Sequence, residues 1–292
     1  MARPVLWNYH PDYAHTVGEM DECVAVYDCM DDHTAFMDGR HQVAENDRRL
    51  LAASGLVYAG GLKMREDRLL YQPEIHFFPC GVEVSHFRQA FEAHPRMRQL
   101  EREGMDSNVT LPDDVRDLTP PILGYWGALD RRIDWELLEE VAEKRRTWTI
   151  VLLGPAVKMP ESEIRAIVER HPNIRWLGPR PYASLPAYAR SFDVCVMPWV
   201  EGGDAESINP TKTLEYLATG RPVVSTRIPD VVAQYGPPEV ELATGPRGFI
   251  AAIERALSND EPQLRESRLA FTRGKTWGAM VEGMEALLQA RL

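Results

Sequence analysis

The chain has 292 residues, 44% of them hydrophobic, which is enough for one large domain or two ordinary domains with a substantial core. Its 44 acidic and 33 basic residues give a formal net charge of −11, which argues against a general binder of nucleic acid or another polyanion. No apolar run approaches the roughly 18 residues of a membrane span, and the N-terminus lacks a signal-peptide pattern, so we expect a cytoplasmic protein.

Residues 1–119 are expected to form a short α/β domain. Apolar, β-rich runs predict strands within residues 3–9, 23–30, 55–61 and 75–82, and a helical period covers residues 42–54. Residues 87–119 are rich in Arg, Glu, Asp and Pro without sustained apolar periodicity, which is typical of a linker.

Residues 120–292 alternate strands and helices, the mark of a parallel α/β sheet. Helices are expected from Asp134, at 161–171, 184–192 and 247–258, and over the last seventeen residues, where an amphipathic helix could pack on either domain. Strands are expected at 121–128, 147–154, 173–178, 193–199, 221–226 and 240–243. These elements together predict a Rossmann-like domain.

Four cysteines are scattered in apolar surroundings and form no C-x-x-C pair: Cys23, Cys29, Cys80 and Cys195. This spacing indicates neither a zinc site nor a disulfide scaffold, so we expect reduced, mostly structural thiols.

An anion site is predicted where residues 193–199 lead into the next helix. Asn209 suits an N-cap, Pro210 suits the first helical position, and Gly220 followed by Pro222 predicts a sharp end. The free N–H groups of such a helix lie at the carboxyl edge of the sheet, where open α/β sheets bind ligands. Lys212 is disfavoured there by the helix dipole, which indicates an anionic partner such as a diphosphate.

Glu215, one turn further along, could accept hydrogen bonds from a ribose. The alternative for Lys212 and Glu215 is an ordinary exposed pair on a solvated helix face, and the spacing alone does not choose between the two.

The run "NPTKTLEYLATGRPVVST" resembles the donor-site segment of nucleotide-sugar glycosyltransferases of the GT-B type, which have two Rossmann-like domains. Residues 124–155 and 173–199, together with "HFFPCGVEVSHF" upstream, are similar in element order. The resemblance is to the retaining group 1, family 4-like enzymes. It implies that residues 120–292 hold the nucleotide sugar and that residues 1–119 form an abbreviated acceptor-side domain.

The resemblance also implies roles for individual residues. Glu215 resembles the glutamate that binds the ribose hydroxyls, and Lys212 with the amides around Asn209 would hold the diphosphate. The loop at 127–132 offers Arg131 or Arg132 as a further phosphate contact, and the loop at 178–182 resembles the base-binding edge, where Tyr182 is interpreted as a packing residue. The full donor set is Gly127, Arg131, Arg132, Arg180, Glu206, Ser207, Asn209, Lys212 and Glu215.

Two departures from the family pattern stand out. Where many retaining members carry a first glutamate that touches the donor sugar, this chain has Ser207, with Glu206 and Asp204 close by. The acceptor domain also lacks its usual opening strand and Gly-rich loop, which predicts a homodimer or a partner chain that covers the exposed edge.

Acceptor-side candidates follow the strand at 23–30. Asp28, Asp31, Asp32 and His33 lie near its carboxyl end, and Asp31 and Asp32, ahead of His33, are the candidate general bases. Closely spaced acids are expected to raise one another's pKa. The alternative is a solvated turn that caps the next helix.

The resemblance therefore implies metal-independent, retaining transfer from a nucleoside-diphosphate sugar to a hydroxyl acceptor, without a cofactor or a metal site. Peripheral association with a membrane stays open. Two other functions are weighed against it. A non-catalytic glycosyltransferase-like subunit would bind the nucleotide sugar only, and a sugar-nucleotide epimerase would place an acid and base pair on the donor sugar itself.

Overall fold

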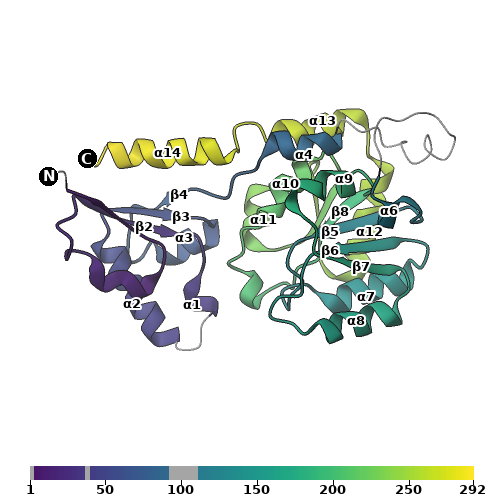
Figure 1. Ribbon diagram of the computed structural model, residues 1–292, viewed down its shortest axis with the longest axis horizontal. Coiled ribbons are helices and arrows are strands. Elements are labelled where there is room, and N and C mark those ends of the chain that lie inside the picture. The colour runs from purple at the N-terminus through teal and green to yellow at the C-terminus, as the bar shows by residue number, and fades with distance from the viewer. Residues whose placement is uncertain (1–2, 37–39, 92–110) are drawn as a thin grey trace. The chain divides into compact units, whose positions relative to one another are not determined.

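The computed structural model describes residues 3–36, 40–91 and 111–292, which form two units (Figure 1). The first unit contains Met1–Gly81, and two later segments, Gly202–Pro210 and Trp277–Leu292, return to it. The second unit contains Val82–Glu201 and Thr211–Thr276. The chain is therefore an α/β protein in which each unit is built on a parallel sheet.

The sheet of the first unit has four parallel strands in the order β1-β2-β3-β4. Their bounds are β1 (Val5–Asn8), β2 (Val24–Cys29), β3 (Leu56–Ala59) and β4 (His76–Phe77). The 3₁₀ helix η1 (Pro11–Thr16) and the helices α1 (His33–Phe36), α2 (Arg40–Ala53) and α3 (Leu62–Arg68) connect these strands. All six residues of β2 are buried, because both faces of this strand are covered.

The two faces of this sheet have separate cores. Tyr27 and Val57 point to the face that packs on Leu50 and Leu51 of α2. Val26, from the same strand, points to the opposite face, as the period of two along a strand requires.

That opposite face is covered by α14 (Trp277–Gln289), the predicted C-terminal amphipathic helix. Met284, Leu287 and Leu288 pack against it, and the Tyr58 hydroxyl donates to the Met284 carbonyl at 2.7 Å. The helix, which the sequence allowed to pack on either domain, therefore belongs to the first unit.

The second unit is a six-stranded parallel sheet in the order β10-β9-β8-β5-β6-β7, with helices on both sides (Figure 1). Its strands are β5 (Ile122–Trp126), β6 (Thr149–Leu153), β7 (Ile174–Gly178), β8 (Val194–Met197), β9 (Val223–Thr226) and β10 (Val240–Ala243). Its helices are α4 (Val84–Phe91), α6 (Asp113–Arg116), α7 (Trp135–Lys144), α8 (Glu161–Arg170), η2 (Tyr182–Ser184), α9 (Leu185–Ala189), α10 (Lys212–Ala218), α11 (Pro229–Gln234), α12 (Gly245–Ser258) and α13 (Pro262–Phe271). The predicted Rossmann-like domain is confirmed.

The expected domain boundary at residue 119 needs correction. The first unit ends at Gly81, and α4, which the polar composition had placed at the edge of the linker, packs into the second unit. Phe87 of α4 is fully buried and stacks on Trp126 of β5 with ring centroids 5.7 Å apart. Residues 92–110 of the expected linker lie outside the described residues.

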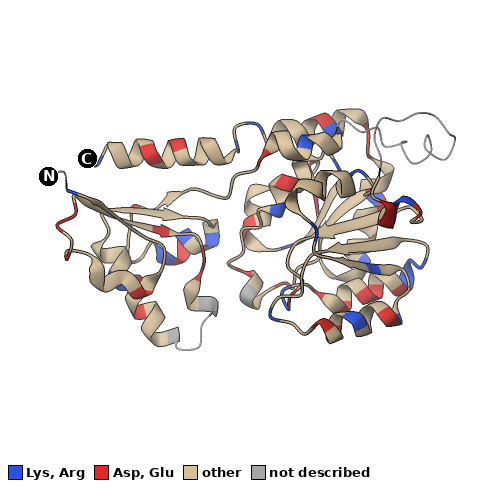
Figure 2. Cartoon of the chain, in the orientation of Figure 1, with Lys and Arg blue, Asp and Glu red and all other residues tan. Residues whose placement is uncertain are grey.

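Charged side chains are interspersed rather than gathered by sign. On α7 and α8, acidic and basic residues share the exposed faces (Figure 2). Lys144 pairs with Glu140 and Arg165 with Glu161, one helical turn apart in each case. These faces offer no basic stripe that would follow a polyanion.

Candidate functional site

Helix α10 begins two residues later than the sequence predicts. Its N-cap is Thr211, in a helical conformation and without a side-chain cap, and its first residue is Lys212. Asn209 does not cap the helix, because its side-chain amide donates instead to the Gly60 carbonyl at 2.6 Å. The predicted end is confirmed, with Thr219 as the C-cap and Gly220 at a φ of +71°.

Lys212 lies against the backbone turn that follows β5. Gly127, the first residue of that turn, has a φ of +140°, and a Cβ there would lie 2.6 Å from Lys212 Nζ and closer still to Cε. The ammonium also lies 5.7 Å from the ring centroid of Tyr125 and 5.3 Å from that of Trp199. Glycine at 127 therefore leaves the space that the lysine side chain occupies.

The Lys212 ammonium makes no hydrogen bond or ion pair with the residues that the structure describes. Burial lowers its pKa, and the nearby Arg132 charge lowers it further, although Glu215 and Asp130 act in the opposite direction. A partly desolvated cation without an acceptor is costly, and a bound anion would remove that cost.

The two arginines of the turn after β5 differ in their surroundings. Arg132 is held by Asp130, which accepts from Nε at 2.9 Å and from Nη2 at 2.5 Å, and its guanidinium lies 5.8 Å from the Trp199 ring centroid. Of the two candidates, Arg132 is therefore the one beside Lys212.

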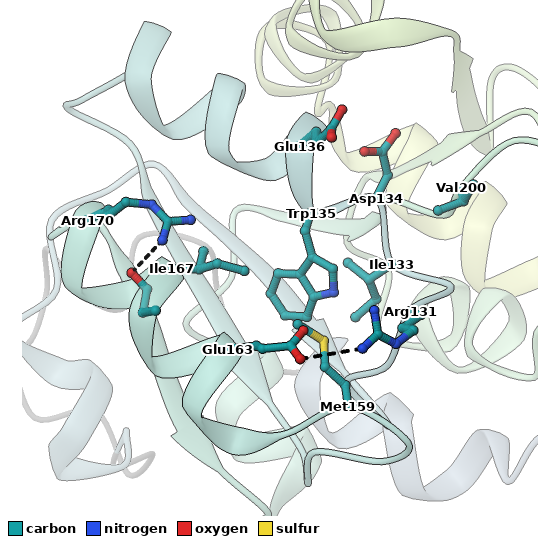
Figure 3. Close-up of a pocket in the computed structure, with 11 residues that line it drawn as sticks. Arg131, Ile133, Asp134, Trp135, Glu136, Met159, Glu163, Ile167, Arg170 and Val200 are labelled. Atoms are coloured by element: carbon teal, nitrogen blue, oxygen red, sulfur yellow. Dashed lines mark hydrogen bonds and ion pairs between the residues drawn. The ribbon is translucent and has the colours of Figure 1, made fainter.

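Arg131 instead lines an open groove of about 670 Å³ on the other side of this turn (Figure 3). It is exposed and pairs with Glu163 of α8 at 3.4 Å. Trp135 lies in the middle of the groove, between Ile133 and Ile167 (Figure 3). Lys212 and Glu215 are not among the residues that line this groove.

Glu215 is held by one oxygen and leaves the other available. The Trp126 indole Nε1 donates to Glu215 Oε2 at 2.8 Å, and Oε1 has no partner within the described part of the chain. Burial raises the pKa of Glu215, while Trp126, Lys212 and His86 each act to lower it. The carboxylate is thus fixed in place with an open acceptor, which suits a ligand hydroxyl.

An aromatic cluster extends from Trp126. Phe87 stacks on Trp126, and Tyr182 meets Phe87 edge to face at 5.5 Å. His86 stacks on Tyr182 with ring centroids 4.5 Å apart, and His86 Nε2 lies 3.0 Å from the Tyr182 carbonyl oxygen. Tyr182 keeps 46% of its surface exposed, so it packs on the cluster and also leaves part of its ring open to solvent. His86 was missed, because it lies next to the segment interpreted as a linker.

Arg180, another predicted donor-site residue, is occupied by neighbours in its own unit. It donates to Asp114 Oδ2 and to the Tyr188 hydroxyl, each at 2.7 Å, and these contacts raise its pKa. This arrangement ties α6 to α9 rather than leaving a free cation.

Glu206, Ser207 and Asn209 belong to the first unit, within the loop Gly202–Pro210. Ser207 Oγ donates to Asp32 Oδ2 at 2.9 Å, whereas Glu206 is exposed in the turn after η3 (Gly203–Ala205). The predicted donor residues are therefore divided between the two units, with Gly127, Lys212 and Glu215 in the second.

The predicted acid cluster after β2 behaves differently from expectation. Burial alone would raise the pKa of Asp32, but hydrogen bonds from Thr34 and Ser207 and the charge of Arg68 outweigh it and hold that pKa below its usual range. Mutual elevation of the acids is therefore wrong for Asp32, because Arg68, 36 residues away, reaches it at 3.1 Å. Asp32 is a structural anion rather than a base.

The other two acceptor-side candidates are less constrained. Asp31 is exposed. His33 lies with its ring centroid 4.2 Å from that of His10, and burial together with that neighbouring ring lowers its pKa. A His33 that stays neutral at physiological pH can accept a proton, so it is the better base candidate of the three.

No group of three or more His, Cys, Asp or Glu side chains that could hold a metal ion occurs within residues 3–36, 40–91 and 111–292. In the same ranges, no helix is both long and apolar enough to cross a membrane. None of the four cysteines forms a disulfide within the described residues, and Cys29 and Cys195 are buried.

Comparison with known proteins finds a matching family model over part of the chain, a relative and solved structures of similar fold. The family model described as "Glycosyl transferases group 1" matches residues 120–259. The chain is 25% identical over 294 residues to a protein of Bacillus subtilis (strain 168) named as a candidate teichuronic acid biosynthesis glycosyltransferase, TuaH. That alignment covers 95% of this chain and 70% of the relative.

Solved structures share the fold over nearly the whole chain. Sucrose-phosphate synthase from Thermosynechococcus elongatus matches 98% of this chain and 73% of its own, with a TM-score of 0.73 and 15% identity. Anabaena HepE in complex with UDP matches 98% of this chain and 79% of its own, with a TM-score of 0.74 and 13% identity.

Proposed function

We propose that the chain is a group 1 glycosyltransferase that moves a sugar from a nucleoside-diphosphate sugar to an acceptor hydroxyl. The group 1 family model that matches residues 120–259 and the similarity to the Bacillus relative support this proposal, and the solved structures share the fold. The product would be a polysaccharide, glycolipid or other glycoconjugate. The name of the Bacillus relative, which refers to teichuronic acid biosynthesis, supports the first of these.

The observation that carries this proposal is the Lys212 ammonium over Gly127. A desolvated cation, unpaired within the described residues, lies beside a glycine turn at the carboxyl end of β5, where parallel sheets bind phosphates. We propose that Lys212 binds the diphosphate of the donor. Arg132, which is already held by Asp130, adds positive charge nearby.

Glu215 supplies the second contact of the proposed donor site. Its Oε1 would accept hydrogen bonds from the ribose hydroxyls while Trp126 holds Oε2. The aromatic cluster of His86, Phe87 and Tyr182 offers the exposed Tyr182 ring and its carbonyl to the nucleotide base. Each contact uses a group that the fold has already positioned, which lowers the entropic cost of binding.

The chemistry we propose is metal-independent and retains the anomeric configuration. In sugar transfer, negative charge builds up on the leaving diphosphate, and a preorganised cation stabilises it in the transition state. Lys212 can do this without moving. The proposal of retention rests on the family resemblance. Nuclear magnetic resonance of the first product formed tests it, because this measurement distinguishes α from β linkages.

Nucleotide binding tests the donor site directly. UDP, GDP and dTDP would be titrated calorimetrically into the wild type and into Lys212→Ala. UDP is the first choice because HepE was solved with UDP and with UDP-glucose. Loss of a charge-assisted contact of about 1.5 to 3 kcal/mol predicts affinity weakened by about 10- to 150-fold.

The matched control is Lys144→Ala, on the exposed face of α7, where Lys144 pairs only with Glu140 in the described structure. Its affinity for the nucleotide should equal that of the wild type. Equal affinities for the wild type and Lys212→Ala would remove Lys212 from the site. Binding without transfer or hydrolysis of any nucleotide sugar would favour the non-catalytic subunit instead.

A further inference from the structure

The loop Gly202–Pro210 follows one element of the second unit and precedes another, yet it packs on the first unit. It starts with Gly202 and Gly203 at φ values of +96° and +59°, a backbone conformation that glycine adopts without strain. Its remaining residues are nevertheless held, because Ala205 and Pro210 are buried.

Two side-chain hydrogen bonds anchor this loop to the carboxyl edge of the first sheet. Asn209 Nδ2 donates to the carbonyl of Gly60, directly after β3. Ser207 Oγ donates to Asp32 Oδ2, shortly after β2. Both partners are far away in the sequence, so the loop conformation depends on the tertiary fold of the first unit.

Asp32 is itself held by a buried ionic network. Arg68, at the end of α3, contacts Asp32 Oδ1 through Nη2 and Asp47 Oδ2 through Nε, each at 3.1 Å. The hydroxyl of Tyr27 donates to Asp47 at 2.6 Å. Arg68, Asp32 and Asp47 are each about 5 to 7% exposed. The guanidinium thus orients one oxygen of Asp32 and leaves the other aimed at Ser207.

We propose that Arg68 and Asp32 are positioning residues for the donor site, acting through Ser207 on the loop that leads into α10. This inference rests on the proposed function, in which Lys212 binds the donor diphosphate five residues after Ser207. Chain connectivity limits how far Lys212 can lie from the anchored residues, because consecutive Cα atoms are about 3.8 Å apart. Loss of the anchor should loosen the loop and weaken donor binding.

The two carboxylate oxygens of Asp32 have different partners. Arg68 and the hydroxyl of Thr34 share Oδ1, whereas Oδ2 accepts the bond from Ser207. The bond to the loop is therefore separable from the bonds that stabilise the first unit, and a variant at Ser207 can remove it alone.

Amide hydrogen exchange on the intact, nucleotide-free chain tests the anchor. Ser207→Ala should speed exchange in the peptide that covers residues 202–211 several-fold and leave β2 and β3 unchanged. Ser207→Thr, which keeps a hydroxyl, should restore slow exchange. Ser258→Ala is the matched control, because the exposed Ser258 donates in the described structure only to the Glu254 carbonyl, one turn earlier in α12.

Donor kinetics test the consequence. Ser207→Ala should raise the donor KM by about five- to tenfold, with a smaller change in kcat. This is less than the direct loss of a hydrogen bond to a charged group predicts, because Ser207 acts on the donor site only through the loop. Asp32→Asn should change the donor KM little in the Ser207→Ala background, since the bond between Asp32 and the loop is already absent there.

The outcomes separate this inference from the proposed function. Unchanged loop exchange in Ser207→Ala overturns the inference whether or not the chain transfers sugar. Faster exchange with an unchanged donor KM overturns the link from the loop to the donor site. Faster exchange in a chain that turns over no nucleotide sugar supports the anchor and refutes the proposed function.

Discussion

Replacement of Gly127 by alanine is expected to abolish much of the nucleotide affinity while the fold survives. The new Cβ would lie 2.6 Å from Lys212 Nζ and closer to Cε, inside van der Waals contact. The far end of a lysine side chain is flexible, so it is the lysine rather than the backbone that should yield. Lys212 would then leave the place where we propose that it meets the diphosphate.

The substitution has two separable costs. A non-glycine residue at a φ of +140° is strained, and such strain costs on the order of 1 to 3 kcal/mol of the free energy of unfolding. Displacement of the ammonium should cost about 1.5 to 3 kcal/mol of the free energy of nucleotide binding, which is about 10- to 150-fold in Kd. The free energy of unfolding therefore measures the backbone strain at residue 127, and the nucleotide Kd measures the displacement of Lys212.

A double-mutant cycle in calorimetry distinguishes displacement of the lysine from general damage. Gly127→Ala and Lys212→Ala should each weaken UDP binding, and the double variant should be no weaker than Lys212→Ala alone. Gly274→Ala is the matched control, because Gly274 also has a positive φ, +75°, but an added Cβ there meets nothing within 4 Å.

Gly274→Ala should lose stability without losing affinity. Additive losses in the double variant would show that Gly127 acts independently of Lys212, and the proposed coupling would be refuted. Full affinity in Gly127→Ala would show that the lysine position is irrelevant to nucleotide binding.

Three further predictions concern the pH dependence of binding, the buried ion pairs of Arg68 and the effect of metal removal. Because burial raises the pKa of Glu215, UDP affinity should weaken as pH falls through that raised value, and Glu215→Gln should remove this acidic limb in calorimetry. Arg68→Met should lower the free energy of unfolding by about 3 to 5 kcal/mol in urea titrations, since Asp32 and Asp47 lose their buried counter-charge, whereas exposed Arg49→Met should cost under about 1 kcal/mol. The part of this stability that Asp32 contributes is present above its unfolded pKa and is lost as pH falls through its lower folded pKa. Transfer activity should stay intact in EDTA. If EDTA abolishes activity and Mg²⁺ or Mn²⁺ restores it, the metal-free mechanism is contradicted.

The alternation of apolar runs with helical periods determined the six strands of the second unit, but it did not predict the helices α4, α6, α11 and α13. Each predicted strand from residue 121 onward is present, and Asp134 caps α7 by accepting from the Leu137 amide at 2.9 Å, as a local signal requires. The same pattern placed Lys212 and Glu215 at the start of a helix after β8, because carboxyl ends of parallel strands share one edge.

Only the tertiary structure decided which polar groups are free to bind a ligand. Asn209 has the residue type and position of a helix N-cap, but its side-chain amide donates instead to the Gly60 carbonyl, 149 residues away in the sequence. Asp32 lies in an acidic run, but Arg68 lowers its pKa. His86 comes from a segment too polar to predict a core helix, yet it stacks on Tyr182.

The physical reason is the range of the interactions involved. Helix periodicity, strand alternation and caps depend on neighbours within a few residues, and those neighbours can be read directly from the chain. Hydrogen-bond partners, desolvation and counter-charges depend on groups that folding brings together across tens of residues. The local pattern therefore determined where the Lys212 helix and its strands lie, and the long-range contacts decided that Lys212 and Glu215 keep open binding capacity while Asn209, Arg180 and Asp32 do not.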